Sequence, residues 1–451
     1  MYRPSMKILV VGSGGREHAL AWKLHESQHV EAFYCAPGNA GIAQEAECVP
    51  LDVSRPQEIL ALAKQLPADL TVVGPEAPLV AGLADEFARE GLTLVGPTRA
   101  AARLEGSKIF AKQFMQRHGI PTAKFAVAEN LDEAVTALTA FKVPVVIKAD
   151  GLAAGKGVAI ARTHEDAARV LDEFMRQKTL GAAGERVVIE ECLTGEEVSF
   201  IVLTDGRGIL VLPPTQDHKA VLDNDQGANT GGMGAYSDDA LLTPGLRGEI
   251  LQRIVTPTLA GMAAEASPFR GFLYCGLMLT SQGPKVLEYN VRLGDPEAQP
   301  LMMRLRSDLV EIFLALREGQ LSVMEAHWSP NPAVCVVLAS AGYPGPYETG
   351  KTITGYEAAE ASGGVKVFHA GTKFIDHRLI TAGGRVLGVT AVAEDLPSAI
   401  QRCYAAVSKI QFEGMHYRRD IGAKGLHRLP PPPRNSRTRP KSGNPSSPKP
   451  R

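Results

Sequence analysis

The sequence predicts a multidomain fold that combines α/β and α+β architecture, and three observations support this prediction. The first hundred residues alternate short apolar runs with helical patterns, which is typical of an open, doubly wound sheet. Residues 141–161 contain two β-rich runs around a glycine-rich loop, and residues 271–290 contain two more strands joined by a turn. At roughly 100 to 200 residues per domain, a chain of 451 residues has room for several domains with well-filled cores.

The composition is that of an ordinary soluble globular protein. Hydrophobic residues make up 45% and charged residues 22% of the chain, which excludes collagen-like and wholly disordered classes. The six cysteines include no C-x-x-C pair, so we expect reduced structural thiols and no zinc ribbon. No apolar run reaches the roughly 18 to 20 residues of a membrane span, and no signal-peptide core follows Lys7. We therefore expect a cytoplasmic protein with no membrane partner.

The formal net charge of −1 conceals a basic tail. Residues 430–451 contain six Lys or Arg, eight Pro and no acidic residue, which leaves 42 basic against 49 acidic residues in the rest of the chain. Such a tail cannot bury a core, so residues 427–451 are predicted to be a disordered Pro-rich extension. A solvated extension is the simpler interpretation, and an arm for nucleic acid or an acidic partner is the alternative. The body of the chain shows no basic footprint for nucleic acid.

The first apolar run, residues 6–11, is followed by glycines and then by a helical pattern. The dinucleotide fingerprint G-x-G-x-x-G would need glycine where this chain has Glu17, and no acidic residue ends the second strand, so a nicotinamide or flavin site is not expected. Gly14 and Gly15 instead precede a helix N-terminus, where free N–H groups and the helix dipole favour a phosphate. Glycines that only permit a tight turn are the alternative.

The loop between the two β-rich runs after Phe141 suits a polyphosphate. Gly151, Gly155 and Gly157 let backbone N–H groups approach an anion closely, and Lys148 and Lys156 bracket the loop with positive charge. The glycine spacing differs from that of a Walker A loop, and no obvious helix follows. The pattern favours a strand-loop-strand lid over a triphosphate, and a flexible surface hairpin is the alternative.

An acidic connector follows about forty residues later. A strand that ends near Ile189 leads into Glu190 and Glu191, a turn at Gly195 and another strand. An exposed backbone N–H and C=O at the end of a strand can pair with the edge of adenine, and a carboxylate at Glu197 can reach ribose hydroxyls. Acidic turns between strands are also common in proteins that bind no nucleotide, and this interpretation stays open.

Polar side chains alternate at the end of the last predicted strand of this block. Glu288 and Asn290 lie two residues apart, so they share one face of a strand, and Arg292 continues that face. Two hard oxygen donors beside a triphosphate suit an octahedral magnesium ion that keeps several waters. The arginine fork suits a carboxylate or a phosphoryl group. A half-exposed polar strand face without function is the alternative.

Taken in order, these blocks resemble the ATP-grasp superfamily and, within it, the family of phosphoribosylamine-glycine ligases, also called glycinamide ribonucleotide synthetases. The stretches that support the resemblance are GGREHALAWKL, APGNAG, VGPEAPLV, EGSKIFAKQF, IKADGLAAGKGV, QDHKAV, NTGGMGAYS, GFLYCGLM, EYNVRLGDPE and FHAGTK. The resemblance implies a Rossmann-like N-terminal domain at 6–107, an ATP-grasp domain at 108–330 with a lid near 124–194, and a small C-terminal α+β domain at 331–426.

The resemblance also implies a reaction in purine biosynthesis, in which ATP, glycine and 5-phosphoribosylamine give glycinamide ribonucleotide, ADP and phosphate through glycyl phosphate. ATP and Mg²⁺ or Mn²⁺ are the implied cofactors, glycine and 5-phosphoribosylamine are the implied partners, and we expect a monomer. Another ATP-grasp ligase or carboxylase that acts on a purine intermediate is the alternative enzyme. A nucleotide-binding regulatory module without turnover is the non-enzymatic alternative.

The same motifs imply roles for individual residues. Catalytic roles are implied for Arg292, Lys148 and Asp295, and metal binding for Glu288 and Asn290. Nucleotide binding is implied for Lys108, Lys148, Gly151, Gly155, Lys156, Gly157, Glu190, Glu191, Leu193 and Glu197. Substrate binding is implied for Gly14, Gly15, Asn39, Glu76, Asp217, His218, Asn229, Gly231, Gly232 and Arg292.

Some of these roles stay open at this level. Asp217 or Asp295 is expected to pair with the ammonium of glycine, and residues 229–234 to form the floor of a tight pocket. His218 is either a general base or a structural or substrate-orienting residue. Many ATP-grasp enzymes have a second metal-binding carboxylate where this chain has Gly276, so waters are expected to complete the metal site. Residues 372–391 are predicted to be paired strands that pack the core, and they offer no candidate for chemistry.

Overall fold

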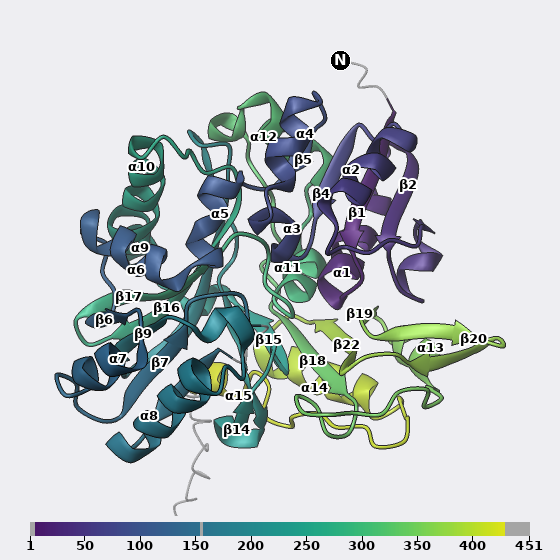
Figure 1. The fold of residues 1–451 in the computed structure, drawn as a ribbon. Coiled ribbons are helices and arrows are strands. Elements are labelled where there is room, and N and C mark those ends of the chain that lie inside the picture. Colours follow the sequence, from purple (N-terminus) through teal and green to yellow (C-terminus); the bar gives the residue numbers. More distant parts are fainter. Residues whose placement is uncertain (1–4, 154–156, 429–451) are drawn as a thin grey trace, which may run out of the picture.

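The structure is a computed structural model that describes residues 5–153 and 157–428. Within these residues an N-terminal parallel sheet, a small antiparallel sheet and a long antiparallel sheet pack together (Figure 1). Gly155 and Lys156, both predicted to bind nucleotide, lie outside the described residues, as does almost all of the predicted tail. The predicted multidomain α/β and α+β fold is confirmed.

The N-terminal sheet is parallel and has the strand order β3-β2-β1-β4-β5. Its strands are β1 (Met6–Gly12), β2 (Val30–Pro37), β3 (Glu47–Cys48), β4 (Leu70–Val73) and β5 (Leu94–Val95). The helices that connect or follow these strands are α1 (Gly15–His25), α2 (Pro56–Gln65), α3 (Glu76–Val80), α4 (Leu83–Arg89), α5 (Arg99–Gly106) and α6 (Lys108–Arg117). Residues 8–11 of β1 are fully buried, which explains the continuous apolar run that predicted this strand.

The small sheet, which we call the lid sheet, contains the strands on either side of the glycine-rich loop. Its strand order is β6-β9-β7-β8, and its strands are β6 (Phe125–Ala128), β7 (Val145–Ala149), β8 (Val158–Ala161) and β9 (Val187–Glu191). Its helices are α7 (Leu131–Leu138) and α8 (His164–Leu171). The buried apolar residues of these elements form a core of their own within residues 126–189. The lid sheet is therefore packed as a separate unit.

The long sheet runs through the middle of the molecule. Its strand order is β17-β16-β10-β12-β15-β18-β22-β19, with β11 paired to β10. The strands before residue 300 are β10 (Glu196–Thr204), β11 (Ile209–Val211), β12 (Thr215–Asp217), β15 (Gly234–Ser237), β16 (Gly271–Thr280) and β17 (Gly283–Asn290). A separate hairpin consists of β13 (Ala220–Leu222) and β14 (Gln226–Asn229). The associated helices are α9 (Pro244–Ile250), α10 (Thr256–Ala264), α11 (Ala298–Arg304) and α12 (Leu309–Glu318).

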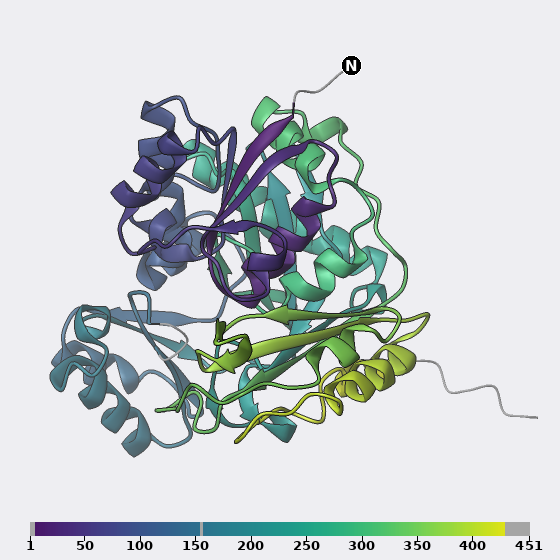
Figure 2. The same cartoon turned by 90° about the vertical axis from the view of Figure 1, so that its right-hand side faces the viewer.

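The C-terminal strands extend this long sheet across the predicted boundary at residue 330. They are β18 (Ala333–Ala339), β19 (Val365–His369) and β22 (Arg385–Val392), and β18 pairs directly with β15. The remaining elements are the hairpin β20 (Thr372–Ile375) and β21 (Arg378–Thr381) and the helices α13 (Tyr356–Glu360), α14 (Leu396–Val407) and α15 (Ala423–Leu426). In Figure 2 these green and yellow strands lie below the purple N-terminal sheet. Loops of the N-terminal sheet and loops of the C-terminal strands therefore lie next to each other.

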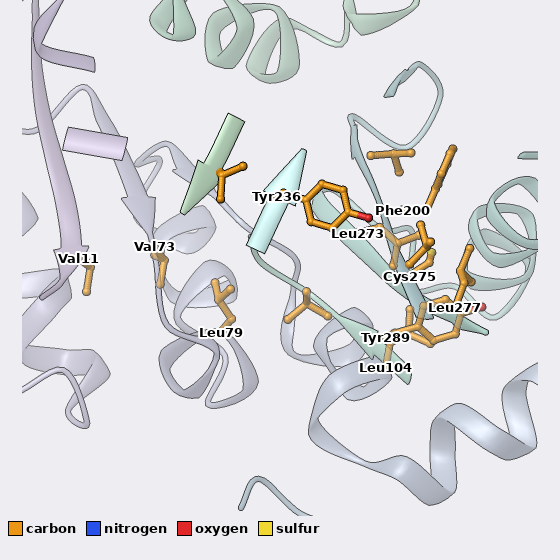
Figure 3. Packing of buried hydrophobic residues seen from close by; sticks show 14 of the residues in the cluster. Val11, Val73, Leu79, Leu104, Phe200, Tyr236, Leu273, Cys275, Leu277 and Tyr289 are labelled. Carbon is orange, nitrogen blue, oxygen red and sulfur yellow. The ribbon is translucent and has the colours of Figure 1, made fainter. Parts of the chain in front are cut away.

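One hydrophobic cluster connects the N-terminal sheet with the long sheet. Val11, Val73 and Leu79 from the first hundred residues belong to the same cluster as Phe200 and Leu273 from the long sheet, and Figure 3 shows these side chains. Close packing of this kind keeps the loops at the ends of the strands in a fixed arrangement. No helix of the described residues is long and apolar enough to cross a membrane.

Candidate active site

Most of the predicted site residues whose structure is described gather where the N-terminal sheet, the lid sheet and the long sheet meet. Together with neighbouring residues that were not predicted, they form four groups. The lysine cluster contains Lys112, Lys148 and Glu190, and the carboxylate cluster contains Glu197, Asp217, Lys219 and Glu288. The arginine cluster contains Glu76, Glu105, Asn290 and Arg292, and the glycine junction contains Gly14, Gly231, Gly232, Asp295 and Arg385.

The lysine cluster links the lid sheet to the long sheet. The Nζ atom of Lys148 on β7 lies 3.1 Å from Oε1 of Glu190 on β9, and it donates to the carbonyl oxygen of Leu287 on β17 at 2.9 Å. Glu190 is 1% exposed, and its Oε2 lies 2.9 Å from Nζ of Lys112 on α6. Burial lowers the pKa of Lys112 to about 8, against the opposing effect of Glu190. The cluster therefore holds two positive charges and one negative charge at the edge of the lid sheet.

Asp150 fixes the start of α6 beside the glycine-rich loop. Its Oδ1 accepts hydrogen bonds from Oγ of Ser107 at 2.7 Å and from the backbone N–H of Ile109 at 2.9 Å. A carboxylate at this position satisfies the free N–H groups of the helix and favours its dipole. Lys108 is consequently held at the N-terminus of α6, next to the loop that begins at Gly151.

The carboxylate cluster surrounds the predicted metal ligand Glu288 on β17. Nζ of Lys219 lies 3.4 Å from Oε1 of Glu288 and 3.4 Å from Oε2 of Glu197. Burial acts to raise the pKa of Glu288, but the ammonium groups of Lys219, Lys108 and Lys148 hold it at about 2. Gly276 on β16 lies directly opposite Glu288, and a Cβ at this glycine would lie 3.3 Å from Cγ of Glu288.

Asp217 at the end of β12 has a buried oxygen that nothing in the described residues satisfies. Its Oδ1 atom has no hydrogen-bond partner there, and burial together with the nearby Glu297 raises its pKa well above the usual range. Glu297 itself accepts hydrogen bonds from the hydroxyls of Tyr274 at 2.8 Å and Ser199 at 3.2 Å. A buried carboxylate oxygen without a donor is a binding position for a small cation.

His218 is fully buried, and neither ring nitrogen has a partner in the described part of the chain. Its ring centroid lies 6.1 Å from that of Tyr236. Burial, followed by the positive charges of Lys424 and Arg418, lowers the pKa of His218 to about 3. With a pKa of about 3 the imidazole is a very weak base, and its full burial separates it from any substrate, so the structural interpretation is favoured over the general-base interpretation.

The arginine cluster holds Arg292 between two acidic side chains. Nη2 of Arg292 donates to Oε1 of Glu105 at 2.7 Å and to Oδ1 of Asn290 at 3.3 Å, and Nε donates to Oε2 of Glu76 at 3.2 Å. Glu105 also accepts from the backbone N–H of Val291 at 2.7 Å, and burial raises its pKa to about 7 against the effect of Arg292. The orientation of the guanidinium group is thus set by α3, α5 and β17 together.

The glycine junction brings the first glycine turn close to Asp295. The N–H of Gly14 donates to the side chain of Glu17, and a Cβ on Gly14 would lie 3.2 Å from Oδ2 of Asp295. These carboxylates already occupy the N-terminus of α1, where a phosphate was predicted. A phosphate would have to displace Glu17 or Asp295 or bind beside them.

Two of the residues that were predicted to bind substrate make contacts with other parts of the protein. Asn39 donates from Nδ2 to the carbonyl oxygens of Ser13 and His369, both at 2.8 Å, and its Oδ1 accepts from the N–H of Gly41 at 2.9 Å. Asn39 therefore ties the N-terminal sheet to β19. Asn229 is exposed at the end of β14, where it pairs with Ala220.

The side chains at this site supply too few oxygen atoms to complete the coordination of a divalent metal ion. The described residues contain no group of three or more His, Cys, Asp or Glu that could hold a metal ion. Glu288 and Asn290 offer two side-chain oxygens at the end of β17, so phosphate oxygens and waters would have to supply the rest. Three ammonium groups, those of Lys108, Lys148 and Lys219, act on Glu288 and suit a polyphosphate beside it.

Comparison with known proteins agrees with this geometry. Three family profiles match the chain: "Phosphoribosylglycinamide synthetase, N domain" over residues 6–105, "Phosphoribosylglycinamide synthetase, ATP-grasp (A) domain" over 106–298 and "Phosphoribosylglycinamide synthetase, C domain" over 333–424. This chain belongs to the phosphoribosylglycinamide synthetase family. The resemblance inferred from the sequence motifs is thereby confirmed.

Relatives of the family match along nearly the whole chain. The chain is 51% identical to the phosphoribosylamine–glycine ligase of Allochromatium vinosum and 48% identical to that of Vibrio vulnificus, in both cases over 94% of this chain and 99% of the relative. The crystal structure of the Thermotoga maritima phosphoribosylamine–glycine ligase is 36% identical, with a TM-score of 0.80 and coverage of 92% of this chain and 99% of that one. A biotin carboxylase domain from Hydrogenobacter thermophilus, 19% identical with a TM-score of 0.71 and coverage of 92% of each chain, shares the fold.

Five residues contact the predicted site although the sequence did not single them out: Lys112, Glu105, Glu297, Lys219 and Arg385. The first four lie inside or beside quoted motifs, where a charged residue was the available sign. Arg385 lies in the stretch 372–391, which offered no such sign because its partners are far away in sequence. The roles of the predicted site residues stay predictions.

Proposed function

We propose that this chain is an ATP-dependent ligase that joins glycine to 5-phosphoribosylamine and yields glycinamide ribonucleotide, ADP and phosphate by way of glycyl phosphate. The observation that carries the proposal is the position of Asp217. Its buried oxygen, which has no partner among the residues that the structure describes, lies in the same cluster as Glu288 and Lys219, so a site for a small ammonium would adjoin a site suited to a metal and phosphates. Glycine is an ammonium joined to a carboxylate by a single carbon.

Different charged residues would serve different needs of the first step, the transfer of a phosphoryl group from ATP to the carboxylate of glycine. Lys108, Lys148 and Lys219 would neutralise phosphate oxygens, and Arg292, held between Glu76 and Glu105, would orient the carboxylate of glycine. A carboxylate is already an adequate nucleophile toward a phosphoryl group, so these residues need to supply positioning and charge and no general base. Their attachment to packed strands and helices suits that task.

The metal would be held by Glu288 and Asn290, and Mg²⁺ and Mn²⁺ both accept this oxygen donor set. When bound, it would supply charge stabilisation to the phosphates. Glu191, the half-buried last residue of β9, and Leu193, two residues further along, would face the nucleotide base, and Glu197 the ribose.

The second substrate would approach from the glycine junction. Its amine is neutral and attacks the activated glycyl carbon, so no side-chain nucleophile is needed. Gly14 and Gly15 would line the path beside Asp295, with the phosphate of 5-phosphoribosylamine near the N-terminus of α1. Because acyl phosphates hydrolyse, exclusion of water by the lid sheet would determine how much glycyl phosphate reaches the amine.

The test is phosphate release from MgATP with glycine present, with and without 5-phosphoribosylamine generated from ribose 5-phosphate and ammonia, while the product is followed by mass spectrometry. Release that requires both substrates, together with formation of glycinamide ribonucleotide, supports the proposal. Binding of ATP without phosphate release in any combination would contradict it, and phosphate release with another carboxylic acid would point to a different ATP-grasp ligase.

A further inference from the structure

Arg385, the first residue of β22, contacts the candidate site from the C-terminal strands. Its Nη1 donates to the carbonyl oxygen of Gly231 at 2.7 Å and to that of Asp295 at 2.6 Å, and its Nη2 lies 3.1 Å from Oδ2 of Asp295. A weaker contact joins Nη1 to the carbonyl oxygen of Gly232 at 3.5 Å. One guanidinium group thus binds two segments that lie more than sixty residues apart.

The segment bound by Arg385 is next to the buried oxygen of Asp217. Gly232 has a positive φ of 112°, and a Cβ there would lie 2.4 Å from Cδ of Pro296 and 2.8 Å from Oδ1 of Asp217. Gly232 is therefore packed between Asp217 on one side and the Asp295-Pro296 segment on the other. Any movement of these segments changes the space in front of Asp217.

Asp295 is held from several directions. In the described residues its side chain forms one ion pair, and the partner is Arg385. Nε2 of Gln299 donates to Oδ1 of Asp295 at 2.8 Å, while Arg385 takes Oδ2. The side chains of Arg385 and Asp295 are 23% and 12% exposed. A bidentate arginine in a partly desolvated setting fixes geometry more firmly than a lysine, since its planar fork sets direction as well as charge.

A second contact from the C-terminal strands supports the same segment. The N–H of Gly231 donates to the hydroxyl of Tyr343 at 3.1 Å, so both backbone polar groups of Gly231 are bound by residues that follow β18. Gly231 itself is exposed. Its position depends on these two side chains.

We propose that Arg385 is a positioning residue for the amino acid substrate: it holds Gly231, Gly232 and Asp295 at the spacing that lets Asp217 bind the ammonium of glycine. This inference rests on the proposed function. Arg385 touches neither the nucleotide side of the site nor the lysine cluster in the described residues. Its loss should therefore affect glycine and leave the nucleotide almost unaffected.

The experiment compares R385A and R385K with R378A, which removes an exposed arginine from the neighbouring hairpin strand β21. The wild type is first shown to form product, because failure at that step concerns the proposed function and not this inference. KM for glycine, KM for ATP and kcat are then measured for each variant, and the affinity for ATP alone is measured by calorimetry. Added guanidinium ion serves as chemical rescue of R385A.

We expect R385A to raise KM for glycine by about tenfold or more while the affinity for ATP changes by less than about threefold, since only contacts beside Asp217 are lost. R385K should fall between wild type and R385A, guanidinium should restore part of the R385A activity, and R378A should match wild type. Equal changes in the glycine and ATP constants, with a lowered Tm and no rescue, would reduce Arg385 to a structural contact and overturn the proposal. Unchanged glycine kinetics in R385A would overturn it as well.

Discussion

Asp217 and His218 are neighbours in sequence, yet their buried polar atoms have opposite consequences. The unpartnered oxygen of Asp217 adjoins the charged groups of the carboxylate cluster, where a cation can satisfy it. The imidazole of His218 packs near Tyr236 with both nitrogens unpartnered in the described residues, and its depressed pKa keeps it neutral. At the scale of single residues, the immediate surroundings decide whether a buried polar side chain is suited to bind a substrate or only to pack in the fold.

Glu288→Ala tests the metal assignment. Removal of one of the two proposed side-chain oxygen ligands should lower the rate of ATP turnover by about a hundredfold or more and raise the Mg²⁺ concentration needed for half-maximal activity, because a metal bound there would supply charge stabilisation to the phosphates. Phosphate release measured against Mg²⁺ concentration checks this. Glu318→Ala, an exposed glutamate at the end of α12, is the control. Activity like that of the wild type in Glu288→Ala would remove this residue from the metal site.

His218→Phe tests the structural role of the histidine by its dependence on pH. The folded-state pKa of His218 is about 3, below its usual value of 6.5, so the unfolded chain binds a proton between these values and the folded chain does not. The wild type should therefore lose about 1.4 kcal/mol of stability per pH unit at this residue as pH falls from about 6.5 toward 4, and His218→Phe should not.

Urea unfolding of both proteins at pH 7 and pH 5 measures this difference. The variant is also expected to keep most of its ligase activity at pH 7, since the ring is enclosed and its pKa of about 3 makes it a very weak base. Loss of activity in a variant of unchanged stability would instead restore the general-base interpretation.

At the scale of secondary-structure elements, the N-terminus of α1 shows how a predicted anion site is already used by the chain itself. Glu17 folds back onto the N–H of Gly14 and accepts a hydrogen bond from it, and Cβ atoms on Gly12 or Gly74 would collide with its side chain. These glycines make room for Glu17, which a pattern of residue types does not reveal.

Gly14→Val tests whether the second substrate uses this turn. The new side chain would displace Glu17 and press on Asp295, so KM for 5-phosphoribosylamine should rise by about tenfold or more while KM for ATP changes by less than about threefold. Steady-state kinetics with each substrate varied in turn give both constants. Gly245→Val on α9, where a Cβ meets open space, is the matched control. An equal rise of both constants would indicate a folding defect and no specific site.

At the scale of the whole molecule, buried charges join elements that pack as separate units. The lid sheet has its own hydrophobic core, and the lysine cluster connects it through Lys148 to β17 and through Lys112 to α6. Opposite charges at 2.9 to 3.1 Å in a buried setting are costly to separate, because each partner left behind loses its compensation. The position of the lid sheet relative to the nucleotide side therefore depends on this cluster.

Lys112→Met should lower the free energy of unfolding by about 3 kcal/mol, since it leaves Glu190 buried with one partner fewer. The control Lys64→Met breaks the exposed pair with Glu90, whose side chains are 46% exposed, and should change stability by less than about 1 kcal/mol. Differential scanning calorimetry of the three proteins compares the two effects. Equal stability of Lys112→Met and Lys64→Met would show that the lysine cluster adds nothing to the fold.

The sequence predicted the elements well where periodicity is local. The apolar run of β1, the glycine-rich hairpin between β7 and β8, and the strand pair β16 and β17 all follow from short patterns. The pairing of β18 with β15 was not predicted, and it extends the long sheet across the expected boundary at residue 330. Pairing between distant strands depends on which edges meet in space, and the residues of a single strand do not encode that.

By itself, the sequence determined the fold class, the family and the chemical types that gather at the site, because glycine spacing, alternating oxygen donors and bracketing lysines are local patterns. The tertiary structure decided which of these groups are already bound by other residues of the chain. Glu17 caps the turn that was predicted for a phosphate, Glu76 and Glu105 bind Arg292, and Arg385 reaches the site from a stretch in which no chemistry was expected. The physical reason is that pairing and burial of charge depend on distances between segments far apart in the chain, and only the folded packing sets those distances.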